Sequence, residues 1–175
     1  MRRSFFPYSL IFGLSILLTA CGFQLRGSGG TTIPDAWKSM YLATGNPNSE
    51  LSYAVKISFT TNGVVWASER SEAVYVLRLG PEKFQQRNLS LNSQARASEL
   101  ELTLTAEFSV MDTEGNEVLA SSEAIVVEQM ENDPRNVVGK AEEINILKIE
   151  MRNELARQVM RRISFYAAST QSSNP

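Results

Sequence analysis

The most constraining feature of this sequence is a strict alternation of apolar and polar side chains over residues 100–110. Leucine, alanine, phenylalanine and valine occupy the even positions, and glutamate, threonine and serine occupy the odd ones. A repeat of two places every apolar side chain on one face of a β-strand, which is typical of an antiparallel strand with one buried face. The pattern therefore predicts a long strand in a sheet that has its core on one side.

The segment that follows this strand predicts a hairpin. Residues 112–116 read Asp-Thr-Glu-Gly-Asn, a run rich in turn-forming residues, and residues 118–129 then return as the partner strand. Polar residues 89–98 are expected to form a loop between strands. The other β-rich stretches, which complete the predicted sheet, are residues 36–43, 64–66 and 74–79.

Residues 51–61 change to the period of a helix, with a mainly apolar stripe on one face. The preceding turn at residues 44–48 ends beside Asn48 and Ser49, either of which can cap the start of the helix. Asn62-Gly63 predicts its end, because these residues readily adopt the left-handed conformation that closes helices.

A second, longer helix is predicted after Asp133-Pro134, because Asp is a favoured N-cap and Pro suits the first helical position. Three arginines, at positions 157, 161 and 162, are expected in the last turns, where positive charge complements the helix dipole. The apolar stripe of this helix comprises Ile144, Leu147, Met151, Leu155, Val159 and Ile163.

The order of elements is strand, helix, several strands and helix. It predicts an α+β fold, a two-layer sandwich of two amphipathic helices on a mostly antiparallel four-stranded sheet. The expected domain spans residues 33–166, preceded by a polar spacer at 21–32 and followed by a flexible polar tail at 167–175.

The first twenty residues differ from the rest of the chain. Two arginines follow Met1, and residues 5–18 form an apolar run without charge that is short for a membrane-spanning helix of about 20 residues. This arrangement is typical of a secretory signal peptide. Leu18-Thr19-Ala20-Cys21 resembles the lipobox of bacterial lipoproteins, which implies cleavage after residue 20 and an S-diacylglycerol and an N-acyl group on Cys21.

Several acyl chains on Cys21 would anchor the chain stably to a membrane. The next residue is Gly22, whereas an aspartate there typically marks retention in the inner membrane. The sequence therefore predicts a lipid-anchored protein on the periplasmic side of the cell outer membrane.

Composition excludes several classes of function. The 175-residue chain has no histidine, so Ser-His-Asp triads, Cys-His nucleophiles and HExxH zinc sites are absent. Removal of residues 1–20 would take two of the 17 basic residues and none of the 19 acidic ones, which changes the net charge from −2 to −4. This balance argues against nucleic-acid binding.

We expect no metal and no cofactor apart from the covalent lipid. A carboxylate hydrolase is the one enzymatic alternative that this composition leaves. However, Glu99, Glu101 and Glu107 occupy the predicted solvent face of the long strand. We therefore expect that the chain is not an enzyme.

Residues 21–27, Cys-Gly-Phe-Gln-Leu-Arg-Gly, resemble the mature start of the LptE family of lipopolysaccharide-assembly lipoproteins. The turn at 44–48, the helix and exit at 51–64, and Asn132-Asp133-Pro134 before a long helix resemble further elements of that family in the same order. The similarity covers most of residues 21–166. It implies a two-helix, four-stranded domain that sits inside the LptD outer-membrane β-barrel, assists its assembly, and binds lipopolysaccharide during its delivery to the cell surface.

Lipopolysaccharide carries phosphates, which arginine and lysine bind well. The candidate ligands are Lys83, Arg87 and Arg96, in an expected loop at residues 83–96, where cationic side chains are more often ordinary solvated charges. The chain departs from the family at residues 124–131, which contain no basic residue, whereas other members are basic on that strand. An alternative is therefore a scaffold lipoprotein of another envelope or secretion complex that does not bind lipopolysaccharide.

Overall fold

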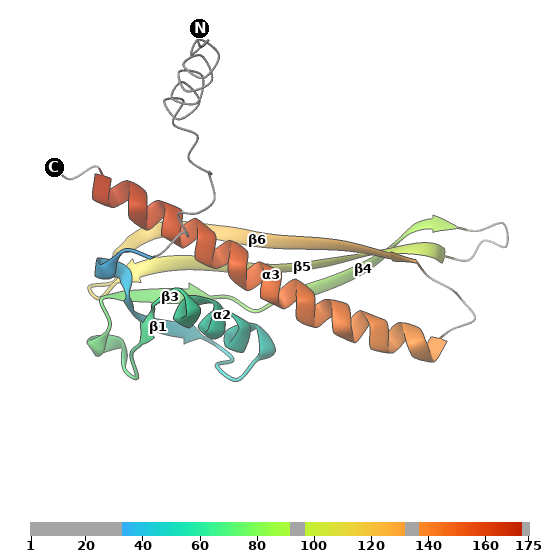
Figure 1. The fold of residues 1–175 in the computed structure, drawn as a ribbon, viewed down its shortest axis with the longest axis horizontal. Coiled ribbons are helices and arrows are strands. Elements are labelled where there is room, and N and C mark those ends of the chain that lie inside the picture. Colours follow the sequence, from blue (N-terminus) through green and yellow to red (C-terminus); the bar gives the residue numbers. More distant parts are fainter. Residues whose placement is uncertain (1–32, 92–96, 132–136, 173–175) are drawn as a thin grey trace, which may run out of the picture. The chain divides into compact units, whose positions relative to one another are not determined.

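The structure, a computed structural model, describes residues 33–91, 97–131 and 137–172 (Figure 1). The predicted signal peptide, Cys21, the spacer and Asp133 lie outside these ranges.

The α+β class with two α-helices is confirmed. The strands are β1 (Ser39–Thr44), β2 (Val65–Trp66), β3 (Tyr75–Leu79), β4 (Lys83–Leu91), β5 (Ala97–Asp112) and β6 (Glu117–Glu131), and the helices are α2 (Glu50–Thr61) and α3 (Val137–Ser172), with 3-10 turns η1 (Asp35–Trp37) and η2 (Arg70–Glu72).

The long strand β5 organises the sheet. β6 pairs antiparallel along one edge of β5, while β3 and β4 follow one another along its other edge. β1 lies parallel to both β3 and β2. The sheet therefore has six strands where four were predicted, and it is mixed. β1 is parallel to its neighbours because the chain returns to the sheet through α2, as parallel pairing requires a crossover connection.

This pairing divides the sheet into two ends. The wide end comprises β2, β1, β3, residues 106–112 of β5 and residues 117–124 of β6. The narrow end comprises β4, residues 97–105 of β5 and residues 125–131 of β6. At the narrow end, β4 occupies residues 83–91, all within the loop predicted at residues 83–96, so this prediction is wrong there.

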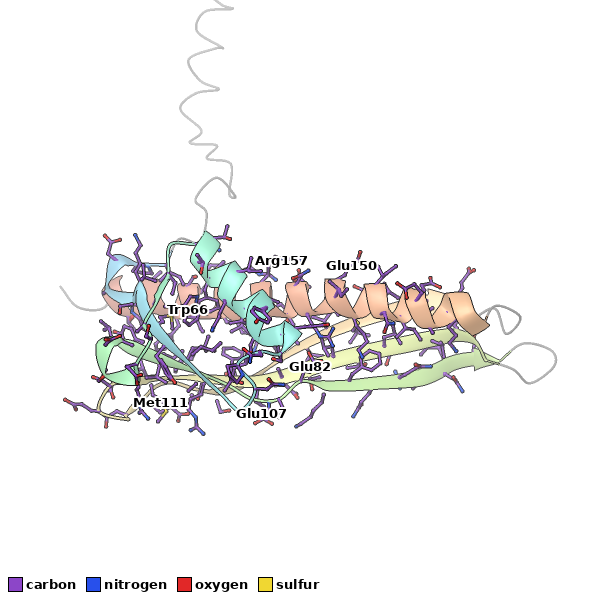
Figure 2. The ribbon with its side chains drawn as sticks, turned by 90° about the horizontal axis from the view of Figure 1, so that it is seen from below. Trp66, Glu82, Glu107, Met111, Glu150 and Arg157 are labelled. Carbon is purple, nitrogen blue, oxygen red and sulfur yellow. The ribbon has the colours of Figure 1, made fainter. Side chains whose placement is uncertain are left out.

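The alternation of β5 produces the two faces that the sequence predicts. Its even-numbered side chains from Leu100 to Val110 are buried beneath the helices. Both helices lie on this side of the sheet, whereas Glu107 and Met111 lie on the opposite side, here called the open face (Figure 2). The helical side chains that complete the core include Leu51, Val55 and Phe59 from α2 and Met151, Leu155, Val159 and Ile163 from α3.

The helix boundaries agree with the sequence at one helix and differ at the other. Ser49 is the N-cap of α2, its hydroxyl accepting the Ser52 N–H at 3.1 Å, and Gly63 follows the helix with a φ of 91°. The helix α3 continues to Ser172, beyond residue 166, where we had ended the domain. It continues because Ala167 is fully buried in the core. No helix in the described ranges is long and apolar enough to span a membrane.

Candidate functional site

The predicted phosphate ligands on β4 lie on the open face of the narrow end. Lys83 stands opposite Thr105 of β5, and Arg87 stands opposite Glu101. Residues four apart on a strand point to the same face, so the two cationic side chains lie along one side of the sheet. The third candidate, Arg96, lies outside the described residues. The structure thus brings two of the three candidates together, on a strand rather than on a loop.

Both cations already have carboxylate partners. Arg87 donates two hydrogen bonds to Glu101, from Nε to Oε1 at 2.5 Å and from Nη2 to Oε2 at 3.0 Å. Lys83 Nζ lies 3.5 Å from Oε1 of Glu107. The Arg87 hydrogen bond lowers the pKa of Glu101, and the same bond raises the pKa of Arg87. A bound phosphate would therefore have to displace Glu101 from the guanidinium group.

These ion pairs also account for two of the three glutamates predicted on the solvent face of β5. Glu101 and Glu107, predicted to be solvated acids, act as counterions of β4. The lowered pKa keeps the Glu101 carboxyl group ionised, and an ionised carboxylate has no proton to donate as a general acid. Among the residues that the structure describes, no group of three His, Cys, Asp or Glu side chains is placed to hold a metal ion.

Sequence reasoning missed a further cation on the open face. Arg78 of β3 lines a depression at the wide end together with Gly45, Gly80 and Ser109. Its Nη1 lies 4.0 Å from the sulfur of Met111, and within the described ranges it makes no ion pair with a carboxylate. In the sequence, Arg78 is the polar residue between Leu77 and Leu79. This pattern indicates that its side chain lies on the solvent face of the strand, but it does not identify the residues beside it.

A second cationic feature lies in the helix layer. Arg157 and Arg161 share one carboxylate, Glu154, through Nε at 2.9 Å and Nη2 at 2.8 Å respectively. These hydrogen bonds, that from Arg161 first, lower the pKa of Glu154. The two arginines border an apolar groove between α2 and α3 that includes Ile57 and Met160. Arg157 lies on the outer side of α3 in Figure 2.

The predicted role of the α3 arginines is wrong. The helix has no basic residue in its last turn, since it extends ten residues past Arg162 to Ser172. Arg157 and Arg161 pair with Glu154, and Arg162 donates from Nη1 to the backbone oxygen of Glu123 on β6 at 2.7 Å. These residues make tertiary and local contacts in the body of the helix instead of compensating its dipole.

Arg152 is the clearest case of a residue whose surroundings the sequence did not reveal. It does not belong to the apolar stripe predicted for α3, yet its side chain is only 12% exposed. Its guanidinium donates to Glu82, with distances of 2.7–3.1 Å, and to Glu50 at the start of α2. The bond to Glu82 raises the pKa of Arg152. Arg152 therefore connects α3 to α2 and to the segment between β3 and β4.

Comparisons with known proteins agree on one family. The LptE family model, described as lipopolysaccharide-assembly, matches residues 37–163. The LPS-assembly lipoprotein LptE of Photorhabdus laumondii is 29% identical over 156 residues, which cover 89% of this chain and 84% of the relative. The protein of the same name from Pectobacterium atrosepticum is 25% identical, with the same coverage.

Two solved structures extend the agreement to the fold. A minor lipoprotein from Acinetobacter baumannii has a TM-score of 0.63 at 25% identity, covering 75% of this chain and 93% of that one. Rare lipoprotein B from Shewanella oneidensis has a TM-score of 0.60 at 26% identity, covering 77% of this chain and 96% of that one. Since the family model spans most of the described residues, the chain belongs to the LptE family of lipopolysaccharide-assembly lipoproteins, which are not enzymes.

Proposed function

We propose that this LptE-family lipoprotein is anchored through lipids on Cys21 to the periplasmic side of the outer membrane. There it plugs and helps to assemble an LptD-type β-barrel, and it binds lipopolysaccharide during delivery to the cell surface. The observation that carries this proposal is the family match over residues 37–163. The lipobox-like Leu18-Thr19-Ala20-Cys21 supports the anchor.

The open face of the narrow end has the chemistry that a barrel plug needs. The interiors of large outer-membrane barrels are polar, so a plug must offer hydrogen-bonding groups to the barrel wall. On this face, β4 contributes Gln85 and β5 contributes Thr103 and Thr105, beside the Arg87–Glu101 pair. We therefore propose that this face contacts the barrel.

Isolation of the full chain from membranes in mild detergent tests the barrel partnership. Near-stoichiometric recovery with a large, heat-modifiable outer-membrane protein is the expected result. Recovery with small periplasmic proteins alone would refute the barrel partnership.

Metabolic labelling with palmitate tests the anchor separately. The wild type should incorporate the label and Cys21→Ser should not, whereas labelling of Cys21→Ser would exclude this cysteine as the site.

Lipopolysaccharide binding is proposed to use Lys83, Arg87 and Arg96. The Glu101 carboxylate accepts two hydrogen bonds from the Arg87 guanidinium, so Glu101→Gln should free this group and tighten lipopolysaccharide binding. Arg87→Ala combined with Arg96→Ala should weaken lipopolysaccharide binding. Arg70→Ala, at an exposed cation on η2, is the matched control. Unchanged affinity in the Arg87/Arg96 double variant would contradict the assignment.

The ion pairs also favour a second candidate, a scaffold lipoprotein of another envelope complex that does not bind lipopolysaccharide. Arg87 is bound by a carboxylate, and the described open face of β6 adds glutamates without basic residues. In this case the double variant would bind its protein partners normally, and neither wild type nor Glu101→Gln would retain lipopolysaccharide.

A further inference from the structure

The outer edge of β6 at the narrow end has unpaired backbone groups. β5 occupies one edge of β6 from Glu117 to Glu131, and no strand in the described ranges pairs with the other edge. In Figure 1, β6 is the outermost strand of the sheet on its side. An unpaired edge presents a row of N–H and C=O groups to which another chain can bind.

Two hydrogen bonds show which backbone groups point outward. The N–H of Gly80 donates to the backbone oxygen of Glu107 at 2.8 Å, so Glu107 directs its backbone groups toward β3 and away from β6. Its partner on β6 is Glu123, whose own backbone oxygen accepts the 2.7 Å bond from Arg162. Because backbone direction alternates along a strand, Ile125, Val127 and Gln129 also direct their N–H and C=O groups outward.

The side chains along this edge are unusual for an unprotected strand. Natural edges are commonly protected by lysine, proline or a bulge. Residues 124–131 contain no lysine, arginine or proline, and the irregular pairing of β6 occurs earlier, between Glu117 and Ser122. Ile125 and Val127, on the open face, are 47% and 49% exposed. Arg162 bonds to the backbone oxygen of Glu123, the outward-facing residue immediately before Ile125 and Val127.

The charge on the edge limits what can bind there. Glu123, Glu128 and Glu131 are the only charged side chains between residues 121 and 131 of β6, so every charge along this edge is negative. A second copy of β6 would bring two acidic edges together, whereas opposite charges across neighbouring strands stabilise pairing. The edge therefore favours an extended segment with β-branched residues opposite Ile125 and Val127, and with basic residues opposite the glutamates.

We propose that residues 123–129 of β6 form a docking edge for a basic, extended segment of a partner protein, which adds a strand to the sheet. This inference goes beyond the proposed function and does not depend on lipopolysaccharide binding. The outward backbone groups of Ile125 and Val127 supply the hydrogen bonds, and the docking edge begins at Glu123, whose backbone oxygen already accepts a hydrogen bond from Arg162.

The test uses the full chain in mild detergent and a blocked peptide, Thr-Lys-Val-Thr-Val-Thr-Lys, designed to pair antiparallel with residues 123–129. Amide hydrogen exchange should be fast at Ile125 and Val127 in the free protein and slower once the peptide is bound. Protection at these amides before the peptide is added, rising with protein concentration, would show self-pairing and overturn the proposal. Protection elsewhere, or none, would also overturn it.

Two variants separate edge pairing from general damage. Val127→Pro removes one outward N–H and leaves the bonds to β5 in place, so peptide affinity should fall roughly five- to tenfold. Gln86→Pro makes the same change on the opposite edge of the sheet, in β4, and should leave affinity unchanged. The peptide N-methylated on alternate backbone nitrogens should not bind the wild type. Equal affinity of the two proline variants would contradict the assignment.

Discussion

The wide and narrow ends of the sheet are built from the same central strand but are covered very differently. At the wide end, Trp37 stacks on Tyr75 with ring centroids 4.0 Å apart, and Trp66 packs on Phe59. At the narrow end, α3 alone covers the sheet, and the opposite face and both edges are accessible. Two helices therefore cover the wide end and one covers the narrow end, where β4 and β6 form the two edges of the sheet.

Phe108→Ala should have the largest effect on stability, because it opens a cavity in the core of the wide end. Phe108 is buried between the helices and the sheet, and the expected loss is about 3–5 kcal/mol in the free energy of unfolding. Urea unfolding measures it. Ile125→Ala, at an exposed position of the narrow end, is the control and should change stability by less than about 0.5 kcal/mol. Equal losses in both variants would show that burial beneath the helices does not determine how much these side chains stabilise the fold.

Arg152→Met should have the next largest effect, about 2 kcal/mol, because it leaves the partly buried Glu82 without its charged hydrogen-bond partner. Thermal or urea unfolding detects the change. Arg157→Met removes an arginine from the same helix whose side chain is 54% exposed, and it should cost less than about 1 kcal/mol. If the Arg157 variant were the less stable of the two, the contacts of Arg152 with Glu82 and Glu50 would not be the main polar contribution of α3 to stability.

Ser49→Ala should lower stability by about 1 kcal/mol, because the hydroxyl no longer accepts the Ser52 N–H at the start of α2. Its effect should appear in the wide end, as faster amide exchange in the first turn of that helix. Thr61→Ala, at the exposed end of the same helix, should not change exchange in the first turn. Faster exchange in β4 after Ser49→Ala would show that the two ends unfold together.

Glu154→Gln should have the smallest effect, below about 1 kcal/mol after allowance for solvent screening. The pKa of Glu154 is lowered by Arg161 and Arg157 in the folded protein, so its contribution is present above the usual value of 4.5. That contribution is lost as pH falls through the lowered pKa. Unfolding measured from neutral pH to pH 3 should show the difference between wild type and variant shrinking in acid. A difference independent of pH would contradict the assignment.

The features predicted from sequence are those that depend on one buried face. The alternation in β5 and the apolar stripe of α3 each reflect packing against a single core, so periodicity alone identifies them. The strand β4 was missed because Phe84 is the only apolar residue between Lys83 and Asn88, so an edge strand there resembles a polar loop. The end of α3 was missed because Ala167 is followed by small and polar residues, which resemble a flexible tail, although Ala167 itself is buried.

The candidate site shows the same limit. Sequence composition pointed to Lys83 and Arg87, but their counterions depend on the register of β4 with β5, which no local pattern specifies. Arg152 lies 70 residues from Glu82 and 102 from Glu50, so its burial could not be read from the helical pattern. Charge pairs of this kind are decided by the topology of the sheet.

Photo-crosslinking in cells tests most directly whether the narrow end contacts a barrel partner, as proposed. A photoreactive residue would replace Gln85, on the open face of the narrow end, or Ser71, exposed at the wide end. We expect position 85 to crosslink strongly to a large, heat-modifiable outer-membrane protein and position 71 to do so weakly. Crosslinks from position 85 to small periplasmic proteins alone, or to the barrel from position 71 alone, would contradict it.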